Sequence, residues 1–375
     1  MTAPRFLQIH TLTSYTAALL NRDDSGLAKR LPYGGVLRTR ISSQCLKRHW
    51  RLAEDPHALH SIDGAEAAFR SRELVTKKVI GPLRDAGIAD EVLAKLDPAF
   101  QKAVYGDKAD KGKASRQTLL FGAPELAWLA SEAARLAHDA AGDPKVAEQA
   151  AVDWGKMFFQ NIKMMRANTT LPGGLTSALF GRMVTSDPEA NITAPVHVAH
   201  AITVHQEEVE SDYFTAVDDL SGDEPGADTI QETELTSGLF YGYVVVDLKG
   251  LLDNLGGDAV LAGEVLHNLI YLIAEVTPGA KLGSTAPYGR AGLMLLEAGD
   301  RQPRSLAEAF RNPCAPHLGP AANALAEQLG AFDTAYATGE DRRVLSLANC
   351  EVPSATPGSL SDLALWAKTL PGLLS

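Results

Sequence analysis

The order in which strand-like and helix-like segments follow one another constrains the fold more than any other feature of the sequence. Short runs that alternate in polarity or are rich in β-branched residues predict strands, and longer runs with apolar residues every three or four positions predict helices. With two long insertions set aside, the order is βαββαβ, as in ferredoxin-like and RRM-like domains. The segments are strand 6–12, a helix from Ser42 or Ser43 to about Glu54, strands 197–206 and 239–248, helix 258–276 and strand 292–298.

The two insertions differ in composition. Residues 59–196 are rich in alanine and show amphipathic helical patterns around 64–80, 123–140 and 144–166. The second insertion is acidic and contains DYFTAVDDL and a turn region rich in Gly, Pro and Asp, which predicts an extended hairpin or loop. The sequence therefore predicts an α+β protein with an RRM-like sheet domain, a large helical insertion and a hairpin.

Charge is distributed very unevenly along the chain. The formal net charge is −11, and residues 183–248 contain no lysine or arginine. Residues 22–51 contain eight basic residues against only Asp23 and Asp24. Such polarity is expected when one face meets an anionic polymer and another faces solvent or a basic neighbour. The eight residues are Arg22, Lys29, Arg30, Arg38, Arg40, Lys47, Arg48 and Arg51.

The stretch RTRISSQCLKRHWR is the most basic part of the chain, and its helical portion separates into a polar and an apolar face. A solvated helix face is one interpretation, but between Ser42 and Ala53 the predicted helix contains no acidic residue to balance these charges. Arg38 and Arg40 approach in an extended segment, while Ser42 and Ser43 add hydroxyl and amide donors, a mixture suited to phosphate binding. The polar face comprises Gln44, Lys47, Arg48 and Arg51, and the apolar face comprises Leu46, Trp50 and Ala53.

Two further segments carry candidate binding residues, each with an ordinary alternative. The glycine-rich loop 279–290 lacks a nucleotide-binding motif, so it is either a mobile loop or a second contact for a nucleic-acid backbone. The aromatic pair Tyr213 and Phe214 is either a small buried anchor or an apolar wedge that inserts between nucleotides. The candidates in the loop are Lys281, Tyr288 and Arg290.

Catalytic and metal-binding interpretations have little support in the sequence. His197, His200 and His205 lie on one predicted strand, but His200 and His205 point to opposite faces and no cysteine is near, so we expect no zinc site. Asp23 and Asp24 can act as general acid–base carboxylates or pair with neighbouring arginines. We expect neither a metal nor a cofactor.

Cysteine usage and hydropathy favour a cytoplasmic protein. Cys45, Cys314 and Cys350 are far apart, as expected of reduced thiols. No apolar run approaches the roughly 20 residues of a membrane helix. The N-terminal residues do not have the pattern of a secretory signal. We therefore expect a cytoplasmic location and no membrane partner.

Several motifs occur together in a fixed order. They are LNRDD (20–24), GG (34–35), RISSQ-LKR (40–48), GRM (181–183), HAIT-HQ (200–206), FTAVDDL (214–220) and PGAK (278–281). In this combination the chain resembles the CasC family, the repeated backbone subunit of the type I-E CRISPR surveillance complex Cascade. The matches lie between about residues 6 and 290.

The resemblance implies a hand-like protein with an RRM-like palm, helical fingers and a hairpin thumb. In this family the thumb folds over the guide RNA and reaches the next subunit. The palm would comprise residues 1–58, 197–210 and 237–375, the fingers residues 59–196, and the thumb residues 211–236.

The resemblance also implies roles for individual residues. Arg182 and Met183 would lie against a displaced base, and Tyr213, Phe214 and Thr215 would form the thumb wedge that kinks it. The family's finger lysines, which attract duplex DNA, do not align, and Lys108, Lys111, Lys113 and Arg116 are the substitutes that we consider. Guide-RNA phosphates and sugars would be bound by Arg22, Arg40, Ser42, Gln44, Lys47, Arg48 and Arg51.

The function that the resemblance implies is non-catalytic. Copies of the chain would polymerise along the CRISPR RNA (crRNA) and present it for pairing with target DNA in antiviral defence. Further partners would be the large, small, Cas-five and Cas-six type subunits and a recruited nuclease. One alternative is a type III-like backbone subunit that cleaves target RNA with a metal ion at Asp23 or Asp24. Another is an RRM-like RNA chaperone that acts as a monomer.

Overall fold

The computed structural model describes residues 3–184, 187–217 and 227–374, without the side chains of Lys111 and of residues 214–217 and 227–231. The chain divides into two compact units. Three stretches that are far apart in the sequence build the first unit. They are Met1–Leu59, Val196–Lys249 and Ala262–Ser375. The second unit comprises His60–Pro195 and Gly250–Leu261.

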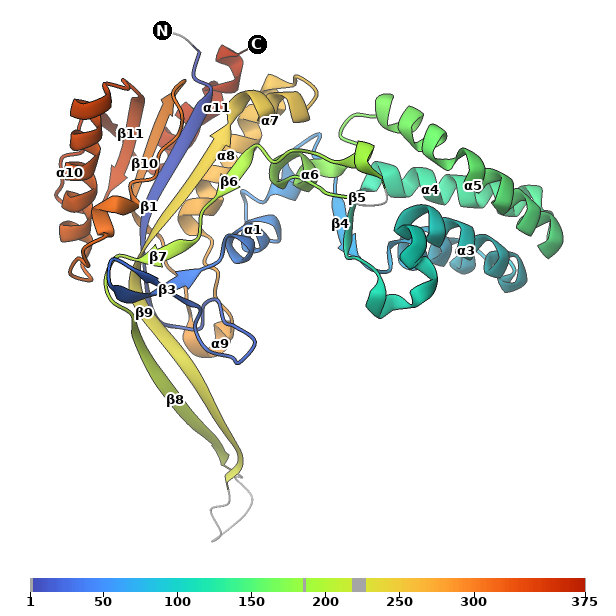
Figure 1. Cartoon of the computed structure of the whole chain (residues 1–375), viewed down its shortest axis with the longest axis horizontal. Coiled ribbons are helices and arrows are strands. Elements are labelled where there is room, and N and C mark those ends of the chain that lie inside the picture. Colours follow the sequence, from blue (N-terminus) through green and yellow to red (C-terminus); the bar gives the residue numbers. More distant parts are fainter. Residues whose placement is uncertain (1–2, 185–186, 218–226, 375) are drawn as a thin grey trace. The chain divides into compact units, whose positions relative to one another are not determined.

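A large antiparallel sheet organises the first unit around β1 (Phe6–Ala18). β10 (Ala291–Gly299) pairs with one edge of β1, and β9 (Ala227–Asp247) pairs with the other. Beyond β9 lie β6 (Val196–Val198) and β7 (Ala201–Thr203). The resulting order, β10, β1, β9 and then β6 with β7, is that of the four strands of an RRM-like domain. Figure 1 shows β1 in the centre of this sheet. The predicted fold class is confirmed.

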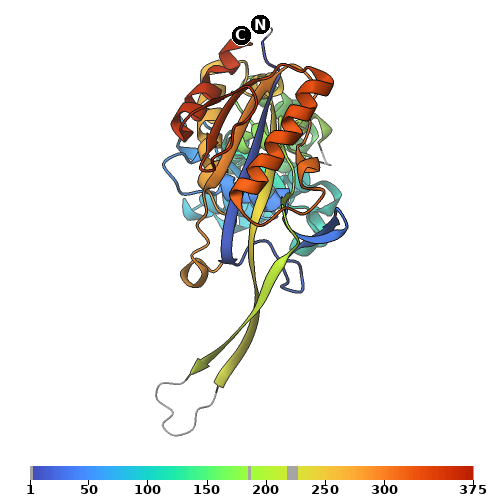
Figure 2. The same ribbon diagram turned by 90° about the vertical axis from the view of Figure 1, so that its left-hand side faces the viewer.

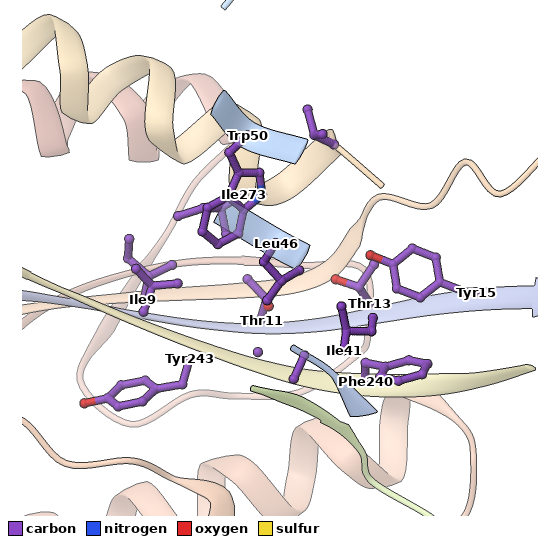
Figure 3. Close-up of a pocket in the computed structure, with 14 residues that line it drawn as sticks. Ile9, Thr11, Thr13, Tyr15, Ile41, Leu46, Trp50, Phe240, Tyr243 and Ile273 are labelled. Carbon is purple, nitrogen blue, oxygen red and sulfur yellow. The ribbon is translucent and has the colours of Figure 1, made fainter. Parts of the chain in front are cut away.

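Alternating residues of β1 face two different helical layers. Ile9, Thr11 and Thr13 lie under α1 (Ser43–Arg51) and α8 (Ala259–Glu275), around a cavity of only about 30 Å³ (Figure 3). Leu12, on the opposite face, packs in the cluster that contains residues of α10 (Leu318–Tyr336). The cavity has room for no more than a few water molecules and is part of the core. The predicted helices at both 42–54 and 258–276 are thus present.

Four strands of the sheet were not predicted from the sequence. β2 (Arg30–Tyr33) and β3 (Val36–Ile41) form a hairpin whose two-residue turn is Gly34–Gly35. Both glycines have positive φ, +63° and +82°, as the favoured tight hairpin turn requires. The remaining two strands extend the sheet beyond β10. They are β11 (Asp341–Ser346) and, parallel to it, β12 (Ala355–Pro357).

The strand predicted at 197–206 is interrupted at His200. Val198 pairs with Val244 and Ile202 pairs with Tyr241, so one strand advances four residues where its partner advances three. This extra residue is a bulge, which turns side chains away from the regular alternation. The Nδ1 atom of His200 accepts a hydrogen bond from the Ser43 amide (3.0 Å) at the start of α1.

The acidic insertion forms a two-stranded hairpin. β8 (Glu208–Val217) pairs antiparallel with the first part of β9, in a register that places Tyr213 opposite Glu232. The second part of β9 continues into the sheet, so that one strand belongs to both structures. Figure 2 shows the hairpin running out from the sheet. Residues 218–226, which include the last three residues of the FTAVDDL motif, lie outside the described residues.

The second unit is helical, with a small sheet of β4 (Ala68–Ser71) and β5 (Leu119–Gly122). The helix predicted at 64–80 is wrong, because that range holds β4 and a π-helical segment, Val75–Ile80. The α-helices of this unit are α2 (Gly81–Asp85), α3 (Asp90–Tyr105), α4 (Ala123–Asp139), α5 (Pro144–Ala167) and α6 (Gly174–Phe180). The remaining α-helices of the chain are α7 (Leu248–Asn254), α9 (Leu282–Thr285) and α11 (Leu360–Thr369).

Aromatic packing holds the long helices of the second unit together. Phe100 of α3 stacks on Trp154 of α5 with ring centroids 3.9 Å apart, and Phe158 lies beside Trp154. The start of α5 is capped by Asp143, whose carboxylate accepts a hydrogen bond from the Lys145 amide (2.8 Å). Within the described ranges, none of the helices has the length and apolar character needed to cross a membrane.

The β2–β3 turn packs tightly against the segment that precedes α10. A β-carbon at Gly34 would lie 1.6 Å from the carbonyl oxygen of Arg311, whereas one at Gly35 would meet nothing within 4 Å. Arg38 of β3 is fully buried and donates to the carbonyl oxygens of Thr203 (3.1 Å) and Phe310 (2.8 Å). Its guanidinium also donates to the carbonyl oxygens of Tyr33 and Arg311. Arg38 therefore joins the hairpin to β7 and to residues 310–311.

The two glycines of the turn provide a matched test of this packing. Replacement of Gly34 by Ala adds a steric clash to the cost of positive φ, and we expect it to lower the free energy of unfolding by about 3 kcal/mol. Gly35→Ala retains only the conformational cost of about 1 kcal/mol. Urea denaturation followed by circular dichroism measures both, and equal losses would contradict the tight contact at Gly34.

Arg38 and Arg40, two residues apart on β3, are a second matched pair. Arg38→Ala leaves buried carbonyl groups without donors and opens a cavity, so we expect a loss of about 3 kcal/mol in the free energy of unfolding. Arg40 is partly exposed, and for Arg40→Ala we expect a change within about 0.5 kcal/mol. Denaturation midpoints that fall equally for both variants would refute the structural role of Arg38.

Candidate nucleic-acid interface

Hydrogen bonds from three segments set the position of α1. Ser42 is the N-cap residue, and its hydroxyl accepts from the Cys45 amide (3.3 Å). The Ser42 amide donates to the side chain of Asn21 (2.9 Å), and the Ser43 amide donates to His200. Trp50 is buried on the inner face of the helix. The outer face of α1 is therefore held in one orientation, as the predicted amphipathic pattern requires.

The outer face of α1 and the strand beside it form a cationic surface. Gln44 and Arg48 are exposed, and Lys47 and Arg51 follow at helical spacing on the same face. The Arg40 amide donates to the Lys29 carbonyl (2.8 Å), which brings the neighbouring chain alongside. We call this set the α1 cationic surface; it comprises Arg22, Lys29, Arg40, Gln44, Lys47, Arg48 and Arg51. Lys29 and the positioning residues Asn21 and His200 were not among the predicted site residues, although Asn21 lies in the LNRDD motif.

The pKa of His200 reports the positive potential at this surface. Burial lowers that pKa below the ordinary value of 6.5, and the nearby charges of Arg40, Lys29 and Lys47 lower it further. A neutral imidazole is the form that accepts the Ser43 N–H. Three cations thus act on one position next to the start of α1. A negatively charged ligand at this surface would relieve their mutual repulsion.

Several predicted contact residues have structural roles instead. The prediction that Arg38 binds RNA is corrected, because its buried guanidinium is occupied by carbonyl oxygens and cannot reach a phosphate. The Ser42 hydroxyl is occupied by helix capping, and the Ser43 hydroxyl faces the Gln44 amide oxygen (3.4 Å). Sequence patterns do not separate such residues from exposed ones, because charge and spacing are the same in both cases.

Arg30 is a further case of a cation whose charge is locally balanced. It pairs with Glu207 and Glu234, which lie at the base of the β8–β9 hairpin. The Ala28 amide also donates to Glu234 (2.6 Å). Arg30 therefore attaches the start of β2 to the hairpin, and the α1 cationic surface does not include it.

The loop 279–290 lies against the same hairpin base. The Nζ atom of Lys281 donates to the hydroxyl of Thr233 on β9 (3.3 Å). Arg290 is exposed and pairs with Glu275 (3.4 Å), and Tyr288 is 75% exposed. Tyr288 and Arg290 are thus the predicted residues of this loop whose side chains are largely exposed.

On the hairpin itself, Tyr213 is 62% exposed. Its backbone pairs with that of Glu232 on β9. The side chains of the neighbouring Phe214 and Thr215 lie outside the described residues. Tyr213 therefore presents an aromatic ring to solvent on a two-stranded support.

In the GRM segment of the second unit, Met183 is exposed and Arg182 is buried. Met183 is 69% exposed, whereas Arg182 is 7% exposed and its guanidinium binds Glu125. The expectation that Arg182 lies against a displaced base is therefore corrected, since its charged group is enclosed by protein.

Two of the four cations proposed for DNA contact other groups of the protein. Lys113 pairs with Glu73 (2.7 Å), and Arg116 donates to the Ala109 carbonyl (2.9 Å). Lys108 is exposed, and the side chain of Lys111 lies outside the described residues.

The candidate acidic and histidine residues show no assembled reaction centre. Asp23 caps its own turn, because one carboxylate oxygen accepts from the amides of Ser25 (2.9 Å) and Leu27 (3.0 Å). His205 is buried and accepts from the Leu239 amide (3.1 Å). Among the described residues, no group of three or more His, Cys, Asp or Glu side chains is placed to hold a metal ion.

Comparison with solved structures shows that the fold occurs in other proteins. Two solved structures have similar folds, and both belong to CRISPR RNA-guided surveillance complexes. One, in a pre-nicking state, has 24% sequence identity and a TM-score of 0.79, with 97% of this chain and 100% of that chain covered. The other has 23% identity and a TM-score of 0.70, with coverages of 96% and 99%.

Comparison of the amino-acid sequence identifies the family. No curated protein matches the chain. The family model described as CT1975-like protein, in contrast, matches residues 7–366, which is nearly the whole length. The chain therefore belongs to the CT1975-like family of Cas proteins.

Proposed function

We propose that the chain is a crRNA-binding backbone subunit of a CRISPR surveillance complex of type I-E. The α1 cationic surface carries this proposal, because it is a positively charged, partly exposed surface in a protein of net charge −11. The family membership and the likeness to chains of surveillance complexes support a role in such a complex, and the type I-E assignment rests on the CasC motifs.

The chemistry of the α1 cationic surface suits a nucleic-acid backbone rather than a particular base sequence. Arginine and lysine bind phosphate oxygens, and the Gln44 amide can donate to a sugar hydroxyl. Such contacts carry no sequence information, so the guide sequence remains free to be read by base pairing. Copies of the chain, bound side by side, would cover the spacer of the crRNA.

Base kinking would come from apolar side chains rather than from charge. Tyr213 of the hairpin and Met183 of the second unit are both largely exposed, and apolar side chains can separate stacked bases. An acidic hairpin is suited to this role because the phosphates are held elsewhere, at α1. The runs between kinked bases would then be available to target DNA.

Further partners follow from the same proposal. They are other copies of the chain, the large, small, Cas-five and Cas-six type subunits, target DNA and a recruited nuclease. The subunit itself would be non-catalytic. The position of Asp23 supports this, because its carboxylate already holds a turn.

The first test removes the three cations of α1 together. The Lys47→Ala/Arg48→Ala/Arg51→Ala variant loses three phosphate contacts, and for single strands each contact contributes about −0.7 to the slope of log K against log salt concentration. We expect a slope smaller by about 2 and, from counterion release alone, binding roughly 50-fold weaker at 0.15 M salt. Fluorescence anisotropy of labelled crRNA over a salt series measures both.

In a matched control, three exposed lysines of α5 are each replaced by Ala. They are Lys145, Lys156 and Lys163. This variant loses the same charge from a surface outside the α1 cationic surface, and we expect its RNA affinity and salt slope to stay close to those of the wild type. If the α1 variant binds as tightly as this control, the proposed interface is wrong.

A second test addresses the nuclease alternative at Asp23 or Asp24. The wild-type chain, loaded with crRNA and incubated with complementary RNA and Mg²⁺ or Mn²⁺, is expected to leave that RNA intact on a denaturing gel. Regularly spaced cleavage that disappears in Asp23→Asn or Asp24→Asn would establish the type III-like activity instead. Asp63→Asn, an exposed carboxylate elsewhere, controls for loss of charge alone.

A further inference from the structure

Met183 is an exposed apolar side chain on a tightly held backbone. It is 69% exposed, while its neighbours Arg182 and Val184 are 7% and 1% exposed. The amide and carbonyl of Arg182 both pair with Ile192 (3.0 and 2.9 Å). The Val184 amide donates to the side chain of Asn191 (2.7 Å). Since both flanking residues are anchored, the Met183 side chain cannot withdraw into the core.

Gly181 makes the entry into this segment possible. Its φ is +74°, in the region that favours glycine, and a β-carbon there would lie 2.9 Å from the carbonyl oxygen of Ile192. The GRM motif thus contains a glycine that the backbone requires, an arginine that is buried and a methionine that is exposed.

The anchor of the segment is the buried carboxylate of Glu125 on α4, whose residue is 0% exposed. Arg182 donates to both of its oxygens, Nη1 at 2.5 Å and Nη2 at 3.2 Å. Arg166 of α5 donates to it through Nε (2.6 Å), and the Gly122 amide donates at 3.1 Å. All interactions of this carboxylate therefore converge on the ends of α4 and α5 and on the GRM segment.

The group is electrically balanced. Arg166 also pairs with Asp187, and Arg182 donates through Nε to the Ala190 carbonyl (2.8 Å). Two guanidinium groups thus meet two carboxylates. Buried ion pairs contribute little net stability compared with apolar side chains of similar size, although removal of one partner is costly. What such a group provides is a specified geometry, and here the geometry is that of residues 181–184 and 187–192.

We propose that Glu125 is a positioning residue which, through Arg182, holds Met183 as a pre-organised wedge against an unstacked base of the bound RNA. This inference rests on the proposed function. A wedge whose backbone is already fixed loses little conformational entropy when it meets the base, so more of the contact energy is available for unstacking.

The test uses the full chain in two assays. In the free chain, hydrogen exchange of the segment 181–192 is compared in the wild type, Glu125→Gln and Glu132→Gln. Glu132 is the matched control, because it lies on the same helix and pairs with the exposed Arg135. We expect exchange about tenfold faster in Glu125→Gln, which leaves two guanidinium groups with one carboxylate, and wild-type exchange in Glu132→Gln.

In the second assay the chain is assembled on RNA that carries 2-aminopurine at successive positions, whose fluorescence rises where a base is unstacked. Fluorescence is normalised to bound protein. We expect the contrast between the most and least fluorescent positions to be at least halved in Glu125→Gln and in Met183→Ala, and unchanged in Glu132→Gln. Arg182→Lys, which keeps the charge but loses the fork of hydrogen bonds, serves if Glu125→Gln does not fold, and we expect it to lower the contrast as well.

The outcomes separate this inference from the proposed function. If the wild-type chain does not bind RNA, the proposed function fails. If RNA binds and the fluorescence contrast of Glu125→Gln matches that of the wild type, the positioning role is overturned, even if the melting temperature falls. The same holds for Arg182→Lys where Glu125→Gln does not fold. A contrast that falls in either variant but not in Met183→Ala would overturn the role of the wedge.

Discussion

The pairing of β1 with β9 is the interaction on which the rest of the first unit depends. Because alternate residues of β1 face opposite sides, this pairing places Ile9 under α1 and Leu12 in the core beside α10. It thereby sets the surface on which α1 rests and the direction in which its cations point. The same strand β9 continues beyond the sheet as one half of the hairpin, so the palm-like sheet and the hairpin share one backbone.

Buried arginines are the second organising principle. Arg38 joins β3 to β7 and to residues 310–311, and Arg182 joins the GRM segment to α4. Arg30 attaches the start of β2 to the hairpin base. In each case a guanidinium group meets acceptors from different segments, and its five donors in a planar fork reach more widely than the three donors on the single nitrogen of a lysine. These arginines, which connect different segments of the chain, are thus distinct from those on the outer face of α1.

The predicted fold, and the helix that carries most of the candidate site, were correct where local pattern decides structure. The βαββαβ order and the capped amphipathic helix at α1 depend on periodicity and on Ser42, both of which are visible in the sequence. β2 and β3 were missed although Gly34–Gly35 is a hairpin signal, and the helix at 64–80 was wrong because tertiary pairing made residues 68–71 a strand. Short strands depend on distant partners, so their own residues contain little information about them.

By itself, the sequence determined the RRM-like order of elements, the acidic character of the hairpin and the presence of a helix with one cationic face. Only the tertiary structure decided which cations face solvent. Arg38 and Arg40 are two residues apart on one strand and have the same chemistry, yet one is enclosed by carbonyl groups and the other lies beside α1. The physical reason is that burial and hydrogen-bond partners come from residues far away in the chain, such as Thr203 and Phe310, whose position no local pattern encodes.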